Sequence, residues 1–263
     1  MESALENRTV LVTGASGGIG QAIVRTFAKE KANLVVHFRS NKETASALVD
    51  EIGEERAIAI AADLTNESSV SQLFKQAQQK FGGIDHLICN AGVWPPEHVP
   101  IVEMTVEQWK NTLAIDLTSV FLCCREFMQS VTARSLNDPS IVLIGSTAGV
   151  YGEAGHGDYA SAKSAMICGL MNTLKNEIVA ISRQGRVNSV SPGWVITPMT
   201  KKFADDSAAM NRALATIAMQ KVASPLDIAN AVAFLSSPKL AGHISGQNLV
   251  VSGGMEGRLL NDV

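Results

Sequence analysis

A tyrosine and a lysine four residues apart, Tyr159 and Lys163, are the pair in this sequence best suited to acid–base chemistry. On a helix the two side chains share one face, about 6 Å apart along the axis. A phenol holds its proton to a pH of about 10, and a nearby ammonium lowers that pKa because it favours the phenolate. Such a tyrosine could donate a proton at neutral pH. The same spacing also occurs on exposed helices without any role, so the other motifs decide its meaning.

A glycine-rich turn near the N-terminus could hold a phosphate. Residues 8–13 are apolar and β-branched, which predicts a buried strand, and residues 18–30 carry apolar side chains at helical spacing. A strand, a glycine turn and a helix together point backbone N–H groups at a pyrophosphate. The spacing is not GxGxxG, and a purely structural turn is the alternative. The turn residues expected to bind are Gly14, Ser16, Gly18, Ile19 and Gly20.

Five motifs in register make the chain resemble the short-chain dehydrogenase/reductase family from about residue 6 to about residue 255. They are Thr13-Gly14-x-x-x-Gly18-x-Gly20, Asn90-Ala91-Gly92, Ser146, Tyr159-x-x-x-Lys163 and Pro192-Gly193. Within the family, residues 144–146, 227–235 and 251–255 are most similar to the β-ketoacyl-[acyl-carrier-protein] reductase type. Reductases and dehydrogenases of unrelated substrates share those three passages.

The resemblance implies four catalytic residues. Tyr159 would give the proton, Ser146 would hydrogen-bond the same substrate oxygen, and Lys163 would hold the nicotinamide ribose hydroxyls. The family's fourth residue is an asparagine that supports a water linking the lysine to solvent, and Asp116 occupies its position here. Aspartate can also accept hydrogen bonds, so we expect a working relay; a purely structural Asp116 is the alternative.

The end of the second strand indicates which nicotinamide cofactor binds. A carboxylate there would bind the ribose 2′-hydroxyl and repel a 2′-phosphate, but the strand ends in Phe38 and is followed by Arg39 and Ser40. Arginine pairs well with phosphate, so we predict NADP(H) rather than NAD(H), although a solvated loop arginine remains the alternative. Gly17 replaces a basic residue that many NADP-dependent relatives carry. By resemblance, further cofactor contacts are Asp63, Leu64, Asn90, Ala91, Gly92, Tyr159, Lys163, Pro192, Gly193, Val195 and Thr197.

The residues expected at the substrate are less sharply defined. They are Trp94, Ser146, Tyr151, His156 and Trp194. Residues 198–221, which include Met199, Phe203, Met210 and Met219, are typical of a mobile amphipathic lid, or equally of plain packing. An acyl thioester, a sugar, a steroid and a small ketone all stay open as substrates.

Short β-branched runs alternate with helical periods along the whole chain, which predicts a doubly wound, mostly seven-stranded parallel sheet with helices on both faces. Expected strands are 8–13, 33–38, 57–61, 85–90, 139–146, 186–191 and 247–251. Expected helices are 18–30, 41–52, 66–81, 105–131, 157–183 and 225–236. No linker or repeat divides the chain, so residues 1–263 are predicted to form one Rossmann-type domain. Every motif falls at a strand's carboxyl end or just after one, where this fold binds ligands.

Composition excludes several classes of protein. The 263 residues are 46% hydrophobic with a net charge of −3, so no basic excess indicates nucleic acid. No apolar run reaches the roughly 18 residues of a membrane span, and residues 1–8 lack a secretion signal's apolar core. The four cysteines, Cys89, Cys123, Cys124 and Cys168, lack metal-ligand spacing and indicate reduced thiols, hence a cytoplasmic protein and no metal.

We therefore expect an NADPH-dependent reductase of a ketone or 3-oxoacyl compound. The alternatives are an NAD(P)-dependent alcohol or sugar dehydrogenase, and a catalytically idle NADP(H)-binding regulator. An idle relative is expected to lose the tyrosine or the lysine, and this chain keeps both. A carrier protein would need cations at the site, for which Arg125 and Arg183 are candidates. The family commonly forms tetramers through the helices at 105–131 and 157–183, so a homotetramer or dimer is expected.

Overall fold

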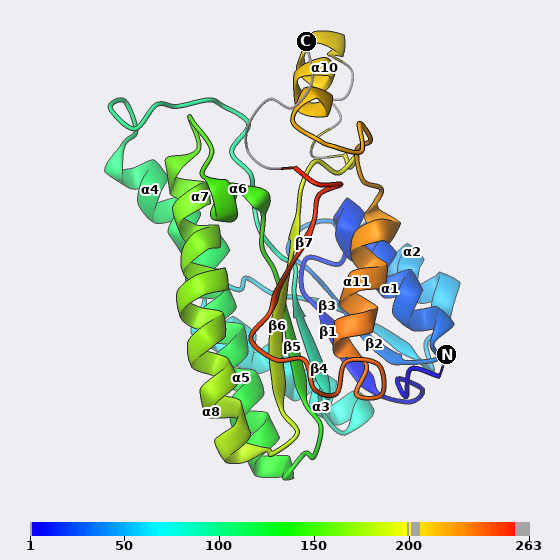
Figure 1. Ribbon diagram of the computed structural model, residues 1–263. Coiled ribbons are helices and arrows are strands. Elements are labelled where there is room, and N and C mark those ends of the chain that lie inside the picture. Colours follow the sequence, from blue (N-terminus) through cyan, green and yellow to red (C-terminus); the bar gives the residue numbers. More distant parts are fainter. Residues whose placement is uncertain (1, 199, 201–205, 256–263) are drawn as a thin grey trace.

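The computed structural model, which describes residues 2–198, 200 and 206–255, contains a seven-stranded parallel sheet with helices on both faces (Figure 1). The strands are β1 (Thr9–Val12), β2 (Asn33–Phe38), β3 (Ala57–Ala61), β4 (His86–Cys89), β5 (Ser140–Ile144), β6 (Arg186–Pro192) and β7 (Asn248–Val251). Their order across the sheet is β3-β2-β1-β4-β5-β6-β7, and all neighbouring pairs are parallel. The predicted doubly wound α/β fold is confirmed.

The chain changes direction across the sheet between β1 and β4. From β1 it builds outward through β2 and β3, then returns to the other side of β1 to add β4 and the later strands. The loops that leave β1 and β4 therefore diverge to opposite faces, and a crevice opens beyond their carboxyl ends. All the predicted motifs follow β1, β4, β5 or β6, so this topology gathers them at one edge.

Two apolar cores lie on the two faces of the sheet, because alternate residues of a strand point to opposite sides. Leu11 of β1 belongs to one core, whereas its neighbours Val10 and Val12 belong to the other. The first core packs under α3 (Glu67–Phe81), α5 (Ser119–Arg134) and α8 (Met171–Ile181). The second packs under α1 (Gly18–Lys29), α2 (Lys42–Ile52) and α11 (Pro225–Ser236).

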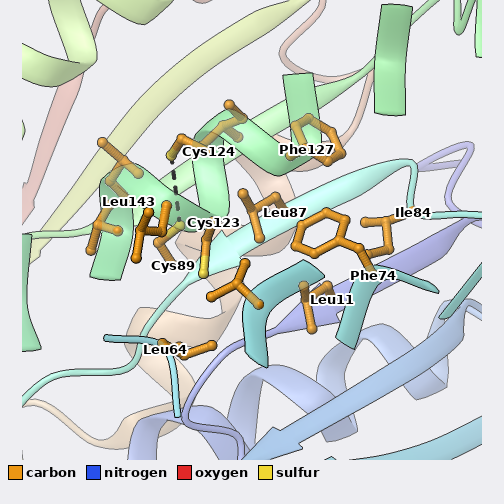
Figure 2. Close-up of a cluster of buried hydrophobic side chains, with 14 of the residues drawn as sticks. Leu11, Leu64, Phe74, Ile84, Leu87, Cys89, Cys123, Cys124, Phe127 and Leu143 are labelled. Atoms are coloured by element: carbon orange, nitrogen blue, oxygen red, sulfur yellow. Dashed lines mark hydrogen bonds between the residues drawn. The ribbon is translucent and has the colours of Figure 1, made fainter. Parts of the chain in front are cut away.

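Figure 2 shows part of the first core, where apolar side chains of the sheet meet those of α3 and α5. Cys89 of β4 and Cys124 of α5 lie in this core with their Sγ atoms 4.0 Å apart, and both are free thiols. Burial and the neighbouring thiol raise the pKa of Cys89, with the hydrogen bond to Cys124 as the leading cause. These cysteines fill the core as small apolar side chains.

Both predicted long helices exist, but each contains a π-helical turn that periodicity does not reveal. Residues 105–131 form α4 (Val106–Leu113), the π-turn η1 (Ala114–Thr118) and α5. Residues 157–183 form α7 (Gly157–Ser164), the π-turn η2 (Ala165–Leu170) and α8. Two short helices were not expected, α6 (Thr147–Tyr151) and α10 (Ser207–Ala215).

Within the described part of the chain, no helix has the length and apolar character needed to cross a membrane.

Candidate active site

A cleft of about 550 Å³ lies at the carboxyl ends of β1, β4, β5 and β6. Its walls combine most of the predicted cofactor, catalytic and substrate residues. These are Gly14, Ser16, Gly18, Ile19, Gly20, Asn90, Ala91, Gly92, Trp94, Asp116, Ser146, Tyr151, Tyr159, Lys163, Pro192, Gly193, Trp194, Val195 and Thr197. The predicted Arg39, Ser40, Asp63, Leu64 and His156 are not among the lining residues.

The glycine turn needs glycines because its backbone is packed against itself and against the segment that follows β4. Gly14 has a φ of +62°, and a Cβ there would lie 2.8 Å from the Cα of Ala91. A Cβ on Gly20 would lie 2.4 Å from the carbonyl oxygen of Gly14. Any side chain at either position would force the turn apart. The turn therefore presents bare backbone to the cleft at the start of α1, which suits an anionic ligand.

Asn90 holds the same turn from the end of β4. Its side-chain amide donates to the carbonyl oxygens of Thr13 (3.0 Å) and Gly14 (3.1 Å). The Thr13 hydroxyl oxygen accepts in return from the backbone N–H groups of Asn90 (2.9 Å) and Ala91 (3.0 Å). Two predicted cofactor segments are thus fastened together before any ligand binds.

His37 of β2 is a second anchor of the turn that sequence reasoning missed. The backbone N–H of Gly14 donates to its Nδ1 at 2.9 Å, so Nε2 carries the proton and donates to the carbonyl oxygen of Ala62 at 3.1 Å. Burial lowers the pKa of His37, opposed by the bond to Ala62, and keeps the ring neutral. The only sequence signal was a histidine inside an otherwise apolar strand.

The predicted catalytic side chains converge in the cleft. Lys163 and Tyr159 lie on one face of α7, with the lysine Nζ 5.6 Å from the centre of the tyrosine ring. Lys163 is buried and donates to the carbonyl oxygen of Ile144 at 3.1 Å. Ser146 begins α6 at the end of β5, and its Oγ accepts from the N–H of Ala148 at 3.1 Å. Tyr159, Lys163 and Ser146 all line the same cleft.

The expected lowering of the Tyr159 pKa is outweighed in this structure. Desolvation by burial raises the pKa of Tyr159 above its usual value, while the Lys163 ammonium and a hydrogen bond with Ser146 lower it. The spacing in the sequence correctly predicts that Lys163 lowers the Tyr159 pKa. It contains no information about burial, which raises that pKa.

Asp116 lies beside Lys163, at the π-turn η1. Its Oδ1 is 3.6 Å from the lysine Nζ and accepts from the N–H of Val93 at 3.0 Å. Its Oδ2 is buried with no hydrogen-bond partner among the described residues. Burial raises the pKa of Asp116, and the Lys163 charge opposes the shift. A Cβ on Gly92 would lie 2.4 Å from Oδ1, so a glycine is needed where the carboxylate meets this loop.

Asp158, directly before Tyr159, is a further residue that sequence reasoning missed. The carboxylate is fully buried and accepts from the Thr112 hydroxyl at 2.7 Å and the Gln108 amide at 3.2 Å, both on α4. Its other oxygen accepts from the backbone N–H of Tyr159 at 2.9 Å. Asp158 therefore ties the start of α7 to the helix that leads into Asp116.

The residues predicted to select the cofactor follow the ends of β2 and β3 and do not line the cleft. Arg39 and Ser40 are exposed directly after β2. Asp63 is exposed after β3, and hydrogen bonds from Thr65 lower its pKa, with a smaller contribution from the Arg39 charge. Leu64 is buried in the first core. The exposed Arg39 guanidinium could therefore contact a phosphate group. The Asp63 carboxylate lies near enough to interact with the same charge.

The predicted substrate residues form an aromatic wall at the other end of the cleft. Trp94 stacks on His156 with ring centres 4.8 Å apart and meets Trp194 edge-on at 6.3 Å. His156 is buried behind Trp94, whereas Tyr151 lines the cleft and donates to the carbonyl oxygen of Met255 at 2.9 Å. Of the predicted lid, Met199 and Phe203 lie outside the described residues. In residues 206–221 the segment contains α10.

The described residues contain no group of three or more histidine, cysteine, aspartate or glutamate side chains placed to hold a metal ion. The open doubly wound sheet, its glycine turn and the cleft at the switch point define a dinucleotide-binding protein of the Rossmann type.

Comparison with known proteins narrows this class. Residues 14–256 match a family model described as enoyl-(acyl carrier protein) reductase. A 3-oxoacyl-[acyl-carrier-protein] reductase of Staphylococcus epidermidis is 34% identical over 253 residues, which span 95% of this chain and 99% of the relative. The corresponding reductase of Vibrio cholerae is 34% identical over 251 residues, 95% of this chain and 98% of the relative.

A solved structure agrees with these matches. A short-chain dehydrogenase/reductase of Brucella melitensis, described as a glucose/ribitol dehydrogenase, superposes with a TM-score of 0.87 at 32% identity. The superposition covers 97% of this chain and 99% of that structure. The chain belongs to the short-chain dehydrogenase/reductase family.

Proposed function

We propose that this protein is an NADPH-dependent oxidoreductase that reduces the carbonyl group of a ketone, such as a 3-oxoacyl group, to a secondary alcohol. The observation that carries the proposal is the convergence of Tyr159, Lys163 and Ser146 on the cleft that also contains the glycine turn. The names of its relatives and its family membership support an enzyme acting between C=O and CH–OH.

The proposed chemistry places proton donors where negative charge develops. A bound NADPH supplies the hydride to the carbonyl carbon. The Tyr159 hydroxyl donates its proton to the carbonyl oxygen as charge builds there. The Ser146 Oγ accepts from the Ala148 N–H, and its hydroxyl, which hydrogen-bonds Tyr159 in this structure, would donate to the same substrate oxygen when the substrate lies between the two residues. In the oxidative direction Tyr159 is the base.

Lys163 and Asp116 complete the proposed proton path. The Lys163 ammonium stabilises the phenolate left on Tyr159 and has hydrogen-bonding capacity for ribose hydroxyls. Asp116 holds the ammonium in place, and its unpartnered buried Oδ2 is suited to accept from a water that leads toward solvent. The aspartate thereby takes over the family's asparagine role and adds a charge.

The proposed NADP(H) site runs from the glycine turn to the catalytic residues. Backbone around Gly14, Ser16 and Gly18 to Gly20 would hold the pyrophosphate at the start of α1. Arg39, with Ser40, would bind the 2′-phosphate, and Asp63 and Leu64 would border the adenine. Asn90, Ala91, Gly92, Pro192, Gly193, Val195 and Thr197 would line the ribose and nicotinamide. NAD(H) fits less well because no carboxylate ends β2.

The runner-up is an alcohol or sugar dehydrogenase working oxidatively, which the name of the solved relative favours. A catalytically idle regulator is less consistent with this site, because Ser146, Tyr159 and Lys163 all meet in one cleft. Delivery of the substrate as an acyl thioester on a carrier protein is part of the proposal, supported by the names of the curated relatives.

The remaining features of the proposal concern the whole chain. Residues 1–263 would act as one domain, with 198–221 as the substrate lid, in a cytoplasmic homotetramer or dimer. An apolar groove of about 270 Å³ between α5 and α8 supports pairing with a second copy, because Phe121, Met128 and Leu174 line it. Four free thiols suit a reducing compartment.

The decisive experiment is a fluorescence titration of the purified protein with NADPH and NADH, followed by a screen of carbonyl compounds. The proposal predicts tighter binding of NADPH and its oxidation in the presence of a ketone. Binding of NADPH without turnover of any ketone or alcohol would favour the idle regulator instead.

A further inference from the structure

Glu153 is a charged residue on the aromatic wall that none of the predicted roles uses. It lies in the loop between α6 and α7, and it lines the cleft with 27% of its side chain exposed. The Nε1–H of Trp94 donates to its Oε1 at 3.2 Å. Its charge is also one of the influences that raise the pKa of Tyr159. The carboxylate is therefore near both the aromatic wall and the proposed proton donor.

The loop that carries Glu153 is fixed in place. Gly155 has a φ of +79°, and a Cβ there would lie 2.2 Å from the ring of His98. The carbonyl oxygen of Gly155 accepts from the N–H of Val99 at 2.9 Å, and the backbone N–H of His156 donates to the carbonyl oxygen of Glu153 at 3.1 Å. Such a loop holds its side chains ready for a ligand rather than folding around it.

His156 lies beside Glu153 on the side away from the cleft lining. The His156 Nε2 lies 3.0 Å from the carbonyl oxygen of Pro95, which only accepts, so Nε2 carries a hydrogen. Its Nδ1 is buried without a hydrogen-bond partner among the described residues and lies 3.4 Å from Glu153 Oε1.

Both contacts involve Oε1, and Glu153 lines the cleft, so its second carboxylate oxygen is left to accept from a ligand there. Burial raises the pKa of Glu153, while the charge of His156 and the bond from Trp94 lower it. A hydrocarbon chain placed here would remove water from the carboxyl group without replacing its hydrogen bonds. A ligand with its own donor would satisfy that oxygen.

We propose that Glu153 is a specificity-determining residue, which accepts a hydrogen bond from a hydroxyl or ammonium group that the substrate carries in addition to its carbonyl. This inference rests on the proposed reductase function and narrows its substrate to polar ketones. Trp94 and Trp194 would contact the carbon skeleton of a hydroxyketone through their faces and edges. The same aromatic rings would stabilise an ammonium by cation–π attraction.

The test uses three ketones of one skeleton with NADPH: butanone, its terminal-hydroxyl derivative and its terminal-amino derivative. In wild type we expect kcat/KM for a substituted ketone to exceed that for butanone by about 10- to 100-fold, the range for a hydrogen bond to a charged group. Glu153→Leu should reduce this ratio to about one. Glu103→Gln, at an exposed glutamate outside the cleft lining, is the matched control and should leave the ratio unchanged.

Glu153→Gln separates the two sources of the donor. Its amide oxygen still accepts, so a hydroxyketone should lose only about fivefold in the ratio, whereas an aminoketone should lose as much as in Glu153→Leu. NADPH titration of each variant checks that the cofactor site is intact. A wild-type enzyme that reduces butanone as well as both derivatives would overturn the inference and leave the reductase function standing. Inertness toward all three ketones with NADPH bound would contradict both.

Discussion

The two ends of the cleft are built by different means. At the nucleotide end, backbone atoms of the glycine turn form the surface, and Asn90 and His37 fasten them to neighbouring strands. At the carbonyl end, side chains from loops form the surface, with Trp94 stacked on His156 and bonded to Glu153. The fold itself therefore forms the surface that would bind the cofactor. The surface that would select the substrate is formed by loop side chains, which the sheet topology does not specify.

The catalytic residues lie where these two ends meet. The largest effect on rate and stability is expected when the ion pair between Lys163 and Asp116 is broken. Lys163→Met leaves Asp116 buried without its counter-charge, so the free energy of unfolding should fall by about 3 kcal/mol. The rate should fall by about 10²- to 10⁴-fold, the usual contribution of acid–base catalysis. Urea unfolding and steady-state kinetics measure the two effects.

The double variant Asp116→Asn with Lys163→Met separates stability from chemistry. Removing both charges should restore most of the stability, because no lone buried charge remains, but it should not restore the rate. Recovery of the rate together with stability would show that Lys163 acts only by packing.

A single methyl group added to the glycine turn should weaken cofactor binding at the nucleotide end of the cleft. In Gly20→Ala the new Cβ would start 2.4 Å from the Gly14 carbonyl oxygen, so the turn must open. Strain of about 1–3 kcal/mol should raise the Kd for NADPH by about 5- to 150-fold. Gly17→Ala is the matched control, because Gly17 has a φ of −77° and its Cβ would meet nothing closer than 3.3 Å. Equal effects of the two substitutions in a fluorescence titration would contradict the geometry.

Cofactor preference should respond to substitutions at Arg39, after β2, and at Gly17, in the glycine turn. Arg39→Ala should weaken NADPH binding by about 10- to 100-fold, because a charge-assisted contact to the 2′-phosphate is lost, and should leave NADH binding nearly unchanged. Gly17→Arg should act in the opposite direction, since it adds the basic residue found in many NADP-dependent relatives. A parallel loss of both cofactors in Arg39→Ala would show that this arginine does not read the phosphate.

The smallest expected effect is a decrease in the free energy of unfolding at acid pH, caused by His37 at the nucleotide end of the cleft. Burial lowers the pKa of His37, so below the ordinary histidine value of about 6.5 the unfolded chain binds more protons than the folded one. The free energy of unfolding therefore decreases as pH falls below about 6.5, with a slope of at most about 1.4 kcal/mol per pH unit from this residue. His86, whose pKa burial lowers to about 3, acts in the same direction.

His37→Asn keeps an acceptor for Gly14 but does not titrate, so it should reduce this slope in urea unfolding measured at several pH values. The slope that His86 causes should remain. His243→Asn, at an exposed histidine, is the control and should leave the slope as it is in wild type. An unchanged slope in His37→Asn would mean that the ring is not held neutral.

Much of this structure could be predicted because its signals are local. Alternating β-branched runs and helical periods predict each strand to within about two residues, as with 139–146 against the observed Ser140–Ile144. Parallel topology then requires Ser146 and the glycine turn to meet at one edge. The two π-turns could not be predicted, because a single extra residue within a helix blurs its period without breaking it.

The missing parts of the site depend on contacts between distant segments. Asp158 is important because Thr112 and Gln108 meet it from another helix, and His37 because Gly14 turns back onto it. No regular spacing in the sequence indicates either of these contacts. The Tyr159 pKa differs from expectation for a similar reason, since burial is a property of the whole fold.

The most direct test of the central claim is a single-turnover experiment with Tyr159→Phe. NADPH is bound to wild type and variant, a reducible ketone is added, and the loss of NADPH absorbance is followed. We predict that the variant binds NADPH as tightly as wild type but oxidises it about 10²- to 10⁴-fold more slowly, because the proton donor is missing. Oxidation at the wild-type rate would contradict the account, since some group other than the Tyr159 hydroxyl would then protonate the substrate.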